Sequence, residues 1–305
     1  MNRSFIASDE NSNRFHTKRT RTTTPVPHRQ PLQPLTSSFN SLSSTTDDLN
    51  PLQLGYYAPE IYENLFNSEC SFLANPEYMN FHTDINYKMR AILIDWLVSV
   101  HLKFKFSPET LYLTVNIIDR YLEKKKIKKQ FLQLAGVSAF LIASKYEDIS
   151  PPAISDLVYV TDKAYTKEQI VEMEEDILVT IEYQLVVPSS WRFFERLSKI
   201  TQMEETDIHF GRFLLELCLV EYHMLRYRPS VIAASAVYLT RKMFKVEPAW
   251  TQNLQRISRV DENQLRDCSR DILVVFQAAS IHTLTGVKDK FSRKEYLEVA
   301  KIRTS

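Results

Sequence analysis

LQLAGVSAFLIASKYE, at residues 132–147, is the stretch of sequence that decides the fold. Its small residues Ala135, Ala139 and Ala143 recur four positions apart, so they lie on one face of a helix. Small side chains leave a shallow groove along that face, and neighbouring helices can pack closely into it. We therefore predict that this segment is the central helix of a bundle.

A second stretch, PSVIAASAVYLTRKMF at residues 229–244, repeats this pattern of small residues. The corresponding pairs are Gly136 with Ala233, Ser138 with Ser235, and Ala139 with Ala236. A repeated central helix predicts two similar helical bundles in tandem. We place their boundary near VVPSS (186–190), where Pro188 is expected to end the preceding helix.

The remaining sequence from about Gly55 onward also has helical spacing, and no stretch alternates apolar and polar residues as a half-buried strand does. Thr166 and Gln169 have the spacing of a capping box, which marks a helix start. The chain is therefore predicted to be all-α. Two apolar stripes support this: Met89, Ile92, Leu93, Trp96, Leu97 and Val100, and then Leu111, Val115, Ile118 and Leu122.

The first 50 residues have a different composition, with sixteen Ser or Thr and four of the thirteen prolines. Such a segment buries too little apolar surface to offset the entropy of ordering, so we predict a disordered regulatory tail. The predicted organisation is tail 1–50, N-terminal helical segment 51–88, first bundle 89–186, second bundle 187–290 and C-terminal extension 291–305.

Charge and composition exclude several classes of protein. Lys and Arg number 38 against 37 Asp and Glu, so the chain lacks the basic excess of a nucleic-acid-binding protein. Its four glycines are far apart, so no Gly-rich phosphate loop can form. Three scattered cysteines predict neither a disulfide framework nor a metal site, and fit a reducing compartment. We expect no signal peptide, no membrane span and no cofactor.

Several long motifs closely resemble those of a cyclin. In the first half they are MRAILIDWLVSVH (89–101), ETLYLTVNIIDRYL (109–122), LQLAGVSAFLIASKYEDISPP (132–152) and VYVTDKAYTKEQIVEMEEDIL (158–178). In the second half they are EYHMLRYRPSVIAASAVYL (221–239) and AWTQNLQRIS (249–258). The VSVH after DWL, with the HLKF that follows, is similar to the mitotic B-type. The resemblance covers about residues 56–290.

This resemblance implies two five-helix cyclin boxes preceded by an N-terminal helix, with no active site of their own. It implies that the chain binds and activates a cyclin-dependent Ser/Thr protein kinase, as a heterodimer, and controls entry into or progress through mitosis. The sequence agrees, because it contains no HExxH, no GxSxG and no DDxxD motif. The expected location is the nucleus and cytoplasm, without direct binding to nucleic acid or membrane.

The resemblance also assigns a kinase-binding surface. Lys145 and Glu174 match the family's Lys and Glu that hydrogen-bond the C helix of the kinase, whereas spacing alone favours ordinary solvated charges. The apolar residues assigned with them are Ile142, Tyr146, Ile149, Leu178 and Leu185, with Tyr57 and Ile61 on the N-terminal helix. Core packing is the alternative for Ile142, Leu178 and Leu185.

Two further sets of residues match the family. Arg90 and Asp119 match a buried ion pair that holds the first box together. Met89, Ile92, Trp96, Leu132 and Gln133 match a groove that docks R-x-L substrate peptides, with core packing as the alternative for part of it. Ser99 stands where A-type cyclins have Glu, and Lys129 replaces an Arg, so poor or altered docking is expected.

Three short motifs carry further predictions. KKKIKK (124–129) is predicted to be a solvated loop between helices. RQPL (29–32) has, in Arg29 and Leu32, the R-x-x-L form of a destruction box that directs ubiquitylation, although Ser37 replaces the usual Asn. KRTR (18–21) has the composition of a nuclear-import patch.

Four alternatives remain open from the sequence. An A-type-like cyclin acting in S and G2 phases has the same motifs. A cyclin-fold transcription factor of the IIB type needs a basic face and usually a zinc ribbon. A helical enzyme of the terpenoid-synthase kind needs clustered magnesium-binding acids, whereas Asp47 and Asp48 stand alone in the tail. A helical scaffold without a kinase partner is the fourth.

Overall fold

The computed structural model describes residues 57–302, and within them every regular element is a helix. This confirms the all-α prediction; the predicted tail 1–50, with Arg29 and Leu32, lies outside the described residues. The α-helices are α1 (Ala58–Ser68), α2 (Tyr87–Phe104), α3 (Pro108–Lys124), α4 (Leu132–Glu147), α5 (Ile154–Val160), α6 (Lys167–Thr180), α7 (Ser190–Ile200), α8 (Glu205–Val220), α9 (Pro229–Met243), α10 (Gln252–Ser258), α11 (Glu262–Ala279) and α12 (Gly286–Phe291). Short 3₁₀ helices are η4 (Glu69–Phe72), η5 (Tyr78–Phe81), η6 (Lys129–Phe131), η7 (Tyr222–Arg226), η8 (Lys294–Tyr296) and η9 (Val299–Lys301).

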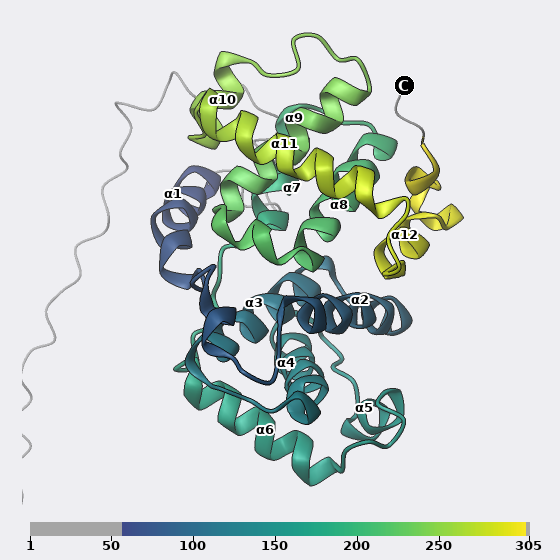
Figure 1. Cartoon of the computed structure of the whole chain (residues 1–305). Coiled ribbons are helices and arrows are strands. Elements are labelled where there is room, and N and C mark those ends of the chain that lie inside the picture. Colours follow the sequence, from purple (N-terminus) through teal and green to yellow (C-terminus); the bar gives the residue numbers. More distant parts are fainter. Residues whose placement is uncertain (1–56, 303–305) are drawn as a thin grey trace, which may run out of the picture. The chain divides into compact units, whose positions relative to one another are not determined.

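Two five-helix bundles follow each other along the described chain (Figure 1). In the first, α2–α6, helix α4 packs against α2, α3 and α6. In the second, α7–α11, helix α9 packs in the same way against α7, α8 and α11. The small residues Ala139 and Ala236 are fully buried in these two central helices, which confirms the predicted tandem bundles.

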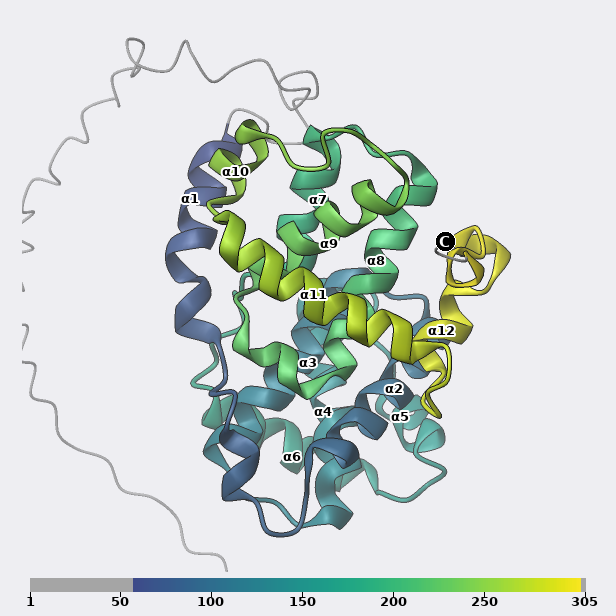
Figure 2. The same cartoon turned by 45° about the horizontal axis from the view of Figure 1, so that its top comes forward.

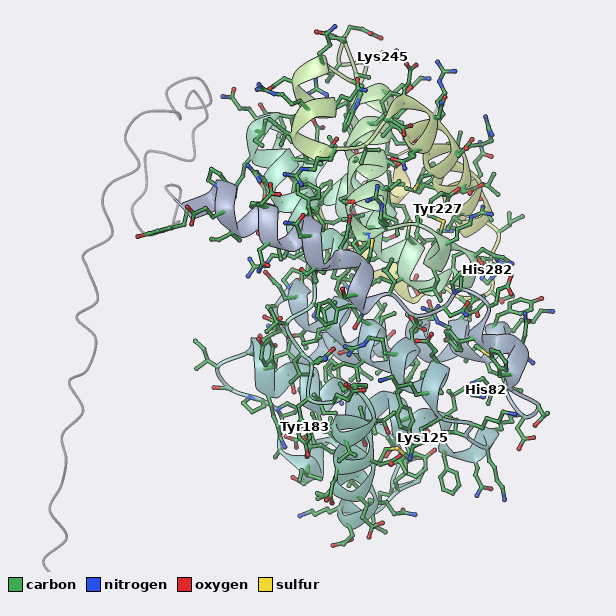
Figure 3. All side chains as sticks on the ribbon, turned by 90° about the vertical axis from the view of Figure 1, so that its left-hand side faces the viewer. His82, Lys125, Tyr183, Tyr227, Lys245 and His282 are labelled. Atoms are coloured by element: carbon green, nitrogen blue, oxygen red, sulfur yellow. The ribbon has the colours of Figure 1, made fainter. Side chains whose placement is uncertain are left out.

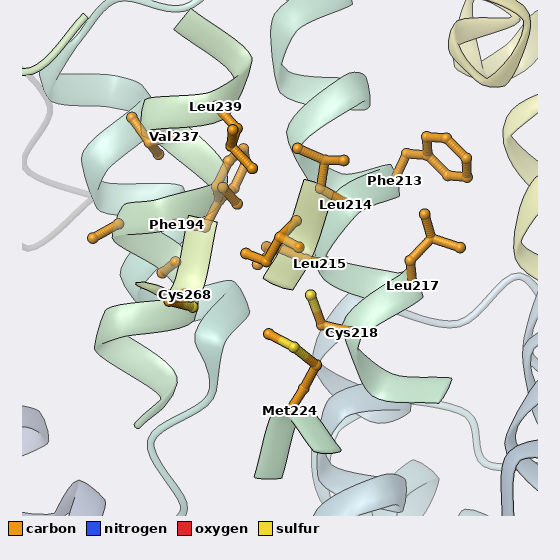
Figure 4. Packing of buried hydrophobic residues seen from close by; sticks show 14 of the residues in the cluster. Phe194, Phe213, Leu214, Leu215, Leu217, Cys218, Met224, Val237, Leu239 and Cys268 are labelled. Carbon is orange, nitrogen blue, oxygen red and sulfur yellow. The ribbon is translucent and has the colours of Figure 1, made fainter. Parts of the chain in front are cut away.

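The second bundle has its own hydrophobic core, part of which Figure 4 shows. Phe194 of α7 and Phe213 of α8 are almost completely buried in it. Gly211 of α8 lies against the Phe194 ring, and a Cβ at this position would overlap that ring. Glycine is therefore needed here for the close approach of α7 and α8, as small residues are needed along α9.

The prediction that Pro188 ends the helix before it is wrong. Helix α6 already ends at Thr180, and the next residues include Glu182 and Tyr183 in left-handed conformations with φ of 58° and 56°. Arg120 of α3 stabilises this early end, because its guanidinium donates to the carbonyl oxygens of Ile181 and Gln184 at 3.3 and 2.8 Å.

A buried ion pair holds the first bundle together and also joins it to the second. Arg90 of α2 donates to both carboxylate oxygens of Asp119 of α3, at 2.6 and 2.7 Å. Its remaining nitrogen donates to the carbonyl oxygen of Leu219 in α8 at 3.1 Å. The pair was predicted within the first box; the contact with α8 adds a link between bundles that the sequence did not indicate.

The segment before α2 also attaches to the second bundle (Figures 2 and 3). Helix α1 packs on α7, where the ring of Phe66 lies 4.8 Å from that of Phe193. The buried carboxylate of Glu69 accepts from the backbone nitrogen and hydroxyl of Ser230, at 3.0 and 2.8 Å. Glu69 thereby satisfies one of the otherwise unpaired N–H groups at the start of α9.

A second buried ion pair, Lys290 with Glu216, was not predicted. The Lys290 ammonium of α12 donates to both carboxylate oxygens of Glu216 in α8, at 2.6 and 2.8 Å. Phe291 and Val299 are buried in the second core beside it. The spacing of Val287, Lys290 and Phe291 places the lysine on the apolar face of its helix. This spacing is the sequence pattern from which the buried lysine could have been predicted.

His101 is buried near this pair, and its titration makes the free energy of unfolding depend on pH. Its Nε2 donates to the carbonyl oxygen of Ser107 at 2.8 Å, and burial, with the positive charge of Lys290, lowers its pKa to about 4. Because the unfolded chain takes up this proton near pH 6.5, the contribution is complete above pH 6.5 and is lost as pH falls towards 4. We expect a loss of about 3 kcal/mol over this window, measured by urea unfolding.

The matched variant is His101→Gln, whose side-chain amide can still donate to Ser107. Its free energy of unfolding should depend less on pH between 6.5 and 4, while acidic residues titrate equally in both chains. Identical pH profiles for the two chains would contradict the assignment to His101.

Candidate protein-binding surface

Lys145 and Glu174 meet on the surface of the first bundle. They lie 29 residues apart in sequence, near the end of α4 and in the middle of α6. The Lys145 Nζ donates to both carboxylate oxygens of Glu174, at 2.7 and 2.9 Å. The lysine side chain is 47% exposed and the glutamate side chain 12%. The ammonium group is thus held in place by its partner but stays open to solvent.

Helix α6 is fixed at its start, and this helps to place Glu174. At its start the predicted capping box forms, with Gln169 N donating to Thr166 Oγ1 and Thr166 N to Gln169 Oε1, at 3.2 and 2.9 Å. The Ser138 hydroxyl of α4 donates to the Ile170 carbonyl at 3.1 Å. These bonds fix the register of α6 against α4, and so the position of Glu174 beside Lys145.

Helix α6 is also anchored to α3 through Asp176. This carboxylate accepts from the Tyr121 hydroxyl and the Lys125 ammonium, each at 2.7 Å. Burial opposes its ionisation, but these two hydrogen bonds and the Lys125 charge prevail, so its pKa lies below the usual value. Two lysines of the KKKIKK segment (124–129) form ion pairs with acidic residues of the first bundle: Lys124 with Glu182 and Lys125 with Asp176.

The chain after α4 is held by Asp148. Its carboxylate accepts from the Ser107 backbone nitrogen at 3.1 Å and from the Thr110 hydroxyl, both at the start of α3. This ties the end of α4 to α3, while Tyr146 is about half exposed and Ile149 is completely exposed. The two apolar side chains are thus presented to solvent on a rigid support.

The other apolar residues assigned to this surface differ in exposure. Leu178 and Leu185 are half-buried, whereas Ile142 is buried in the first core because it faces the interior of the bundle. The core alternative is therefore correct for Ile142. We call the remaining exposed and half-buried residues the α4–α6 surface; it consists of Lys145, Glu174, Tyr146, Ile149, Leu178 and Leu185.

Tyr57 and Ile61 lie elsewhere, at the start of α1. Both are exposed, and α1 itself is held on the second bundle. The ring of Tyr62 helps to hold it, because its hydroxyl donates to the Arg192 carbonyl at 3.0 Å. The structure thus assigns these two residues to a second exposed apolar patch on a different element.

The predicted peptide-docking residues lie on the outer side of α2 and the start of α4. Ile92 is 57% exposed, which is unusual for a large apolar side chain, while Met89 and Trp96 are half-buried. Gln133 is half-buried, Lys129 is exposed and Leu132 is buried in the core. Leu132 therefore supports this surface from below.

The described residues were compared with the requirements of a metal site and of a membrane-spanning helix. Among residues 57–302 no group of three or more His, Cys, Asp or Glu is placed to hold a metal ion. No helix in the same range has the length and hydrophobicity needed to cross a membrane. Exposed apolar side chains around a defined ion pair are instead typical of a protein-binding surface.

Comparison with protein families identifies the class. Residues 60–186 match the cyclin N-terminal domain, and residues 188–305 match the cyclin C-terminal domain. The chain therefore belongs to the cyclin family, as the motifs predict. The match to the C-terminal domain extends to residue 305, whereas the resemblance of the motifs ends at about residue 290.

Individual relatives show which type of cyclin the chain is similar to, namely the B-type. Cyclin-B2-1 of Oryza sativa subsp. japonica is 45% identical over 248 residues, covering 81% of this chain and 59% of the relative. Cyclin-B1-2 of Arabidopsis thaliana is 43% identical over 258 residues, covering 84% and 58%. The predicted similarity to B-type cyclins is confirmed. The chain spans about three fifths of the length of these curated relatives.

Solved structures share the fold. A viral cyclin from herpesvirus saimiri superposes with a TM-score of 0.64 at 23% identity, covering 70% of this chain and 96% of the viral protein. The yeast RNA Pol II CTD kinase CTDK-1 complex contains a chain that superposes with a TM-score of 0.55 at 11% identity, covering 70% and 71%. Both similarities establish the arrangement of helices in the described part of the chain.

Proposed function

We propose that this chain is the regulatory subunit of a cyclin-dependent Ser/Thr protein kinase, with a role in mitosis. The observation that carries the proposal is the α4–α6 surface, where the paired Lys145 ammonium is open to solvent and the same helix end presents the exposed side chains of Tyr146 and Ile149. Membership of the cyclin family and similarity to B-type cyclins support it. The kinase supplies all the phosphoryl-transfer groups, and this chain supplies none.

Activation follows from preferential binding. The Lys145 ammonium can donate to a carbonyl or carboxylate of the kinase, and the apolar rim excludes water from that contact. If these contacts form only with the active arrangement of the kinase helix that carries its catalytic Glu, binding shifts the population towards that arrangement.

The test is reconstitution. The full chain is mixed with a purified cyclin-dependent kinase, and complex formation and peptide phosphorylation are measured. We expect a heterodimer and strong activation. A chain that remains monomeric with every cyclin-dependent kinase tried would disprove the proposal and favour the helical scaffold.

Several finer assignments belong to the same proposal. The α2 surface around Ile92 docks substrate peptides with altered preference, since Ser99 supplies no charge for a peptide arginine. Arg29 and Leu32 serve in ubiquitylation, and the protein occurs in the nucleus and the cytoplasm. Direct binding to nucleic acid is not part of the proposal, in agreement with the balanced charge.

A further inference from the structure

A cavity of about 140 Å³ lies between the two bundles. Its walls come from α3, from the connection that includes residues 187–190, and from α8, η7 and α9. Of α2 only Arg90 lines it, while Ile92 and Trp96 do not, and it reaches the end of α4 only at Glu147. Because both bundles contribute walls, the cavity exists only while they are packed together.

The interior of the cavity is mainly apolar. Leu113 of α3, Leu215 of α8 and Ile232 of α9 line it. The one buried ion pair in its wall, Arg90 with Asp119, is internally compensated and adds no net charge. An engineered apolar cavity of about 150 Å³ binds benzene, so this volume accommodates a single aromatic ring.

One polar group in the wall has no partner. Tyr112 is only 4% exposed and lines the cavity, and its hydroxyl makes no hydrogen bond to any described residue. A buried hydroxyl without a partner costs free energy, but this oxygen is closed off from water-sized contact, so the ring of Tyr112 and not its hydroxyl forms the wall.

The lining of the cavity also carries an excess of negative charge. The carboxylates of Glu109 and Glu147 line it, and Arg192 is the cation beside them. The Arg192 guanidinium is shared, since one nitrogen lies 3.5 Å from both Glu109 and Glu195. Partial burial, together with the charge of Glu109, raises the pKa of Glu147. A cation bound here would relieve this repulsion.

We propose that this cavity binds a small organic cation whose apolar body is about the size of one aromatic ring. The apolar walls take the ring, and the positive group lies towards Glu109 and Glu147. The proposal does not depend on the kinase, because every residue of the site belongs to this chain.

The test uses benzylamine, which is protonated at pH 7, and uncharged benzyl alcohol as a probe of the same shape. Binding to the full chain is followed by the methyl NMR signals of Leu215 and Ile232. We expect saturable shifts with benzylamine at millimolar concentration, and about tenfold weaker binding of benzyl alcohol.

Two variants distinguish the contribution of the negative charge to binding from the contribution of the cavity volume. Glu147→Gln should reduce benzylamine binding several-fold and leave benzyl alcohol binding unchanged. Val187→Phe, at a half-buried lining position, should fill the cavity and abolish binding of both probes. Equal affinity for the two probes, shifts that are confined to surface methyl groups, or undiminished binding to folded Val187→Phe protein would each overturn the proposal.

Discussion

Replacing Lys145 and Glu174 together by alanine is expected to reduce kinase activation at least about 100-fold while leaving the protein folded. Truncating a central anchor of an interface costs at least about 2 kcal/mol, and losing two anchors exceeds the 2.7 kcal/mol or so that corresponds to 100-fold. Since an ion pair of this exposure contributes about 0–1 kcal/mol to stability, the fold should survive. Peptide phosphorylation measures the first effect and thermal unfolding the second.

A charge-swapped variant decides whether the pair acts on a partner or only on this chain. Lys145→Glu with Glu174→Lys restores an ion pair between α4 and α6, yet presents the opposite charges to a kinase. We expect it to be as inactive as the double alanine variant. Full activation by the swapped protein would assign the pair a purely structural role.

The matched control is an ion pair of the same kind on the second bundle. Glu262 and Arg266 lie one turn apart on α11 and are both well exposed. Replacing both by alanine removes the same number of charges far from the α4–α6 surface. Activation should be unchanged, and a comparable loss in this control would show that the assay responds to the loss of any surface ion pair.

The helices could be predicted from the sequence because their signals are local. The apolar stripe of α3 and the capping box at Thr166 depend on residues within one or two helical turns, and the structure has both. The prediction from Pro188 was wrong because α6 ends earlier, where Arg120 donates to the carbonyl groups after the helix. Arg120 is distant in sequence, so no local pattern indicates this contact. A contact across 61 or 64 residues has no periodicity to reveal it.

The site could be predicted only in part for the same reason. Spacing placed Lys145 and Glu174 beside apolar faces, but only the family resemblance grouped them, and their contact depends on how α4 and α6 cross. Ile142 and Leu132 face the core although they have the same type of side chain as their exposed neighbours, because the helix face decides burial.

Replacing Arg90 by alanine is expected to lower the free energy of unfolding by about 3–5 kcal/mol, because it leaves the buried carboxylate of Asp119 without a counter-charge. Of the hydrogen bonds to that carboxylate only the one from the Tyr78 hydroxyl, at 2.8 Å, remains. The carbonyl of Leu219 in α8 also loses a donor. Urea unfolding measures the loss, which is a large part of a typical total of about 5–15 kcal/mol.

Two further variants keep this prediction testable if Arg90→Ala does not fold. Arg90→Lys retains the charge but offers one nitrogen where two nitrogens of the planar guanidinium donate to Asp119, so an intermediate loss is expected. Arg90→Met with Asp119→Leu removes both charges at similar volume and should be more stable than Arg90→Ala. A double variant that is less stable than the single one would mean that the ion pair itself, and not the stranded carboxylate, dominates.

The link from Arg90 to α8 has a separate consequence, because this arginine belongs to both bundles. In Arg90→Lys, amide hydrogen exchange in the last turn of α8, next to Leu219, should become faster than in a variant that retains the arginine, such as Asp119→Asn. If Arg90 acted only within the first bundle, both variants would change exchange in α2 and α3 alone. We expect faster exchange in α8 for Arg90→Lys and not for Asp119→Asn, because only Arg90→Lys removes the guanidinium nitrogen that donates to the Leu219 carbonyl.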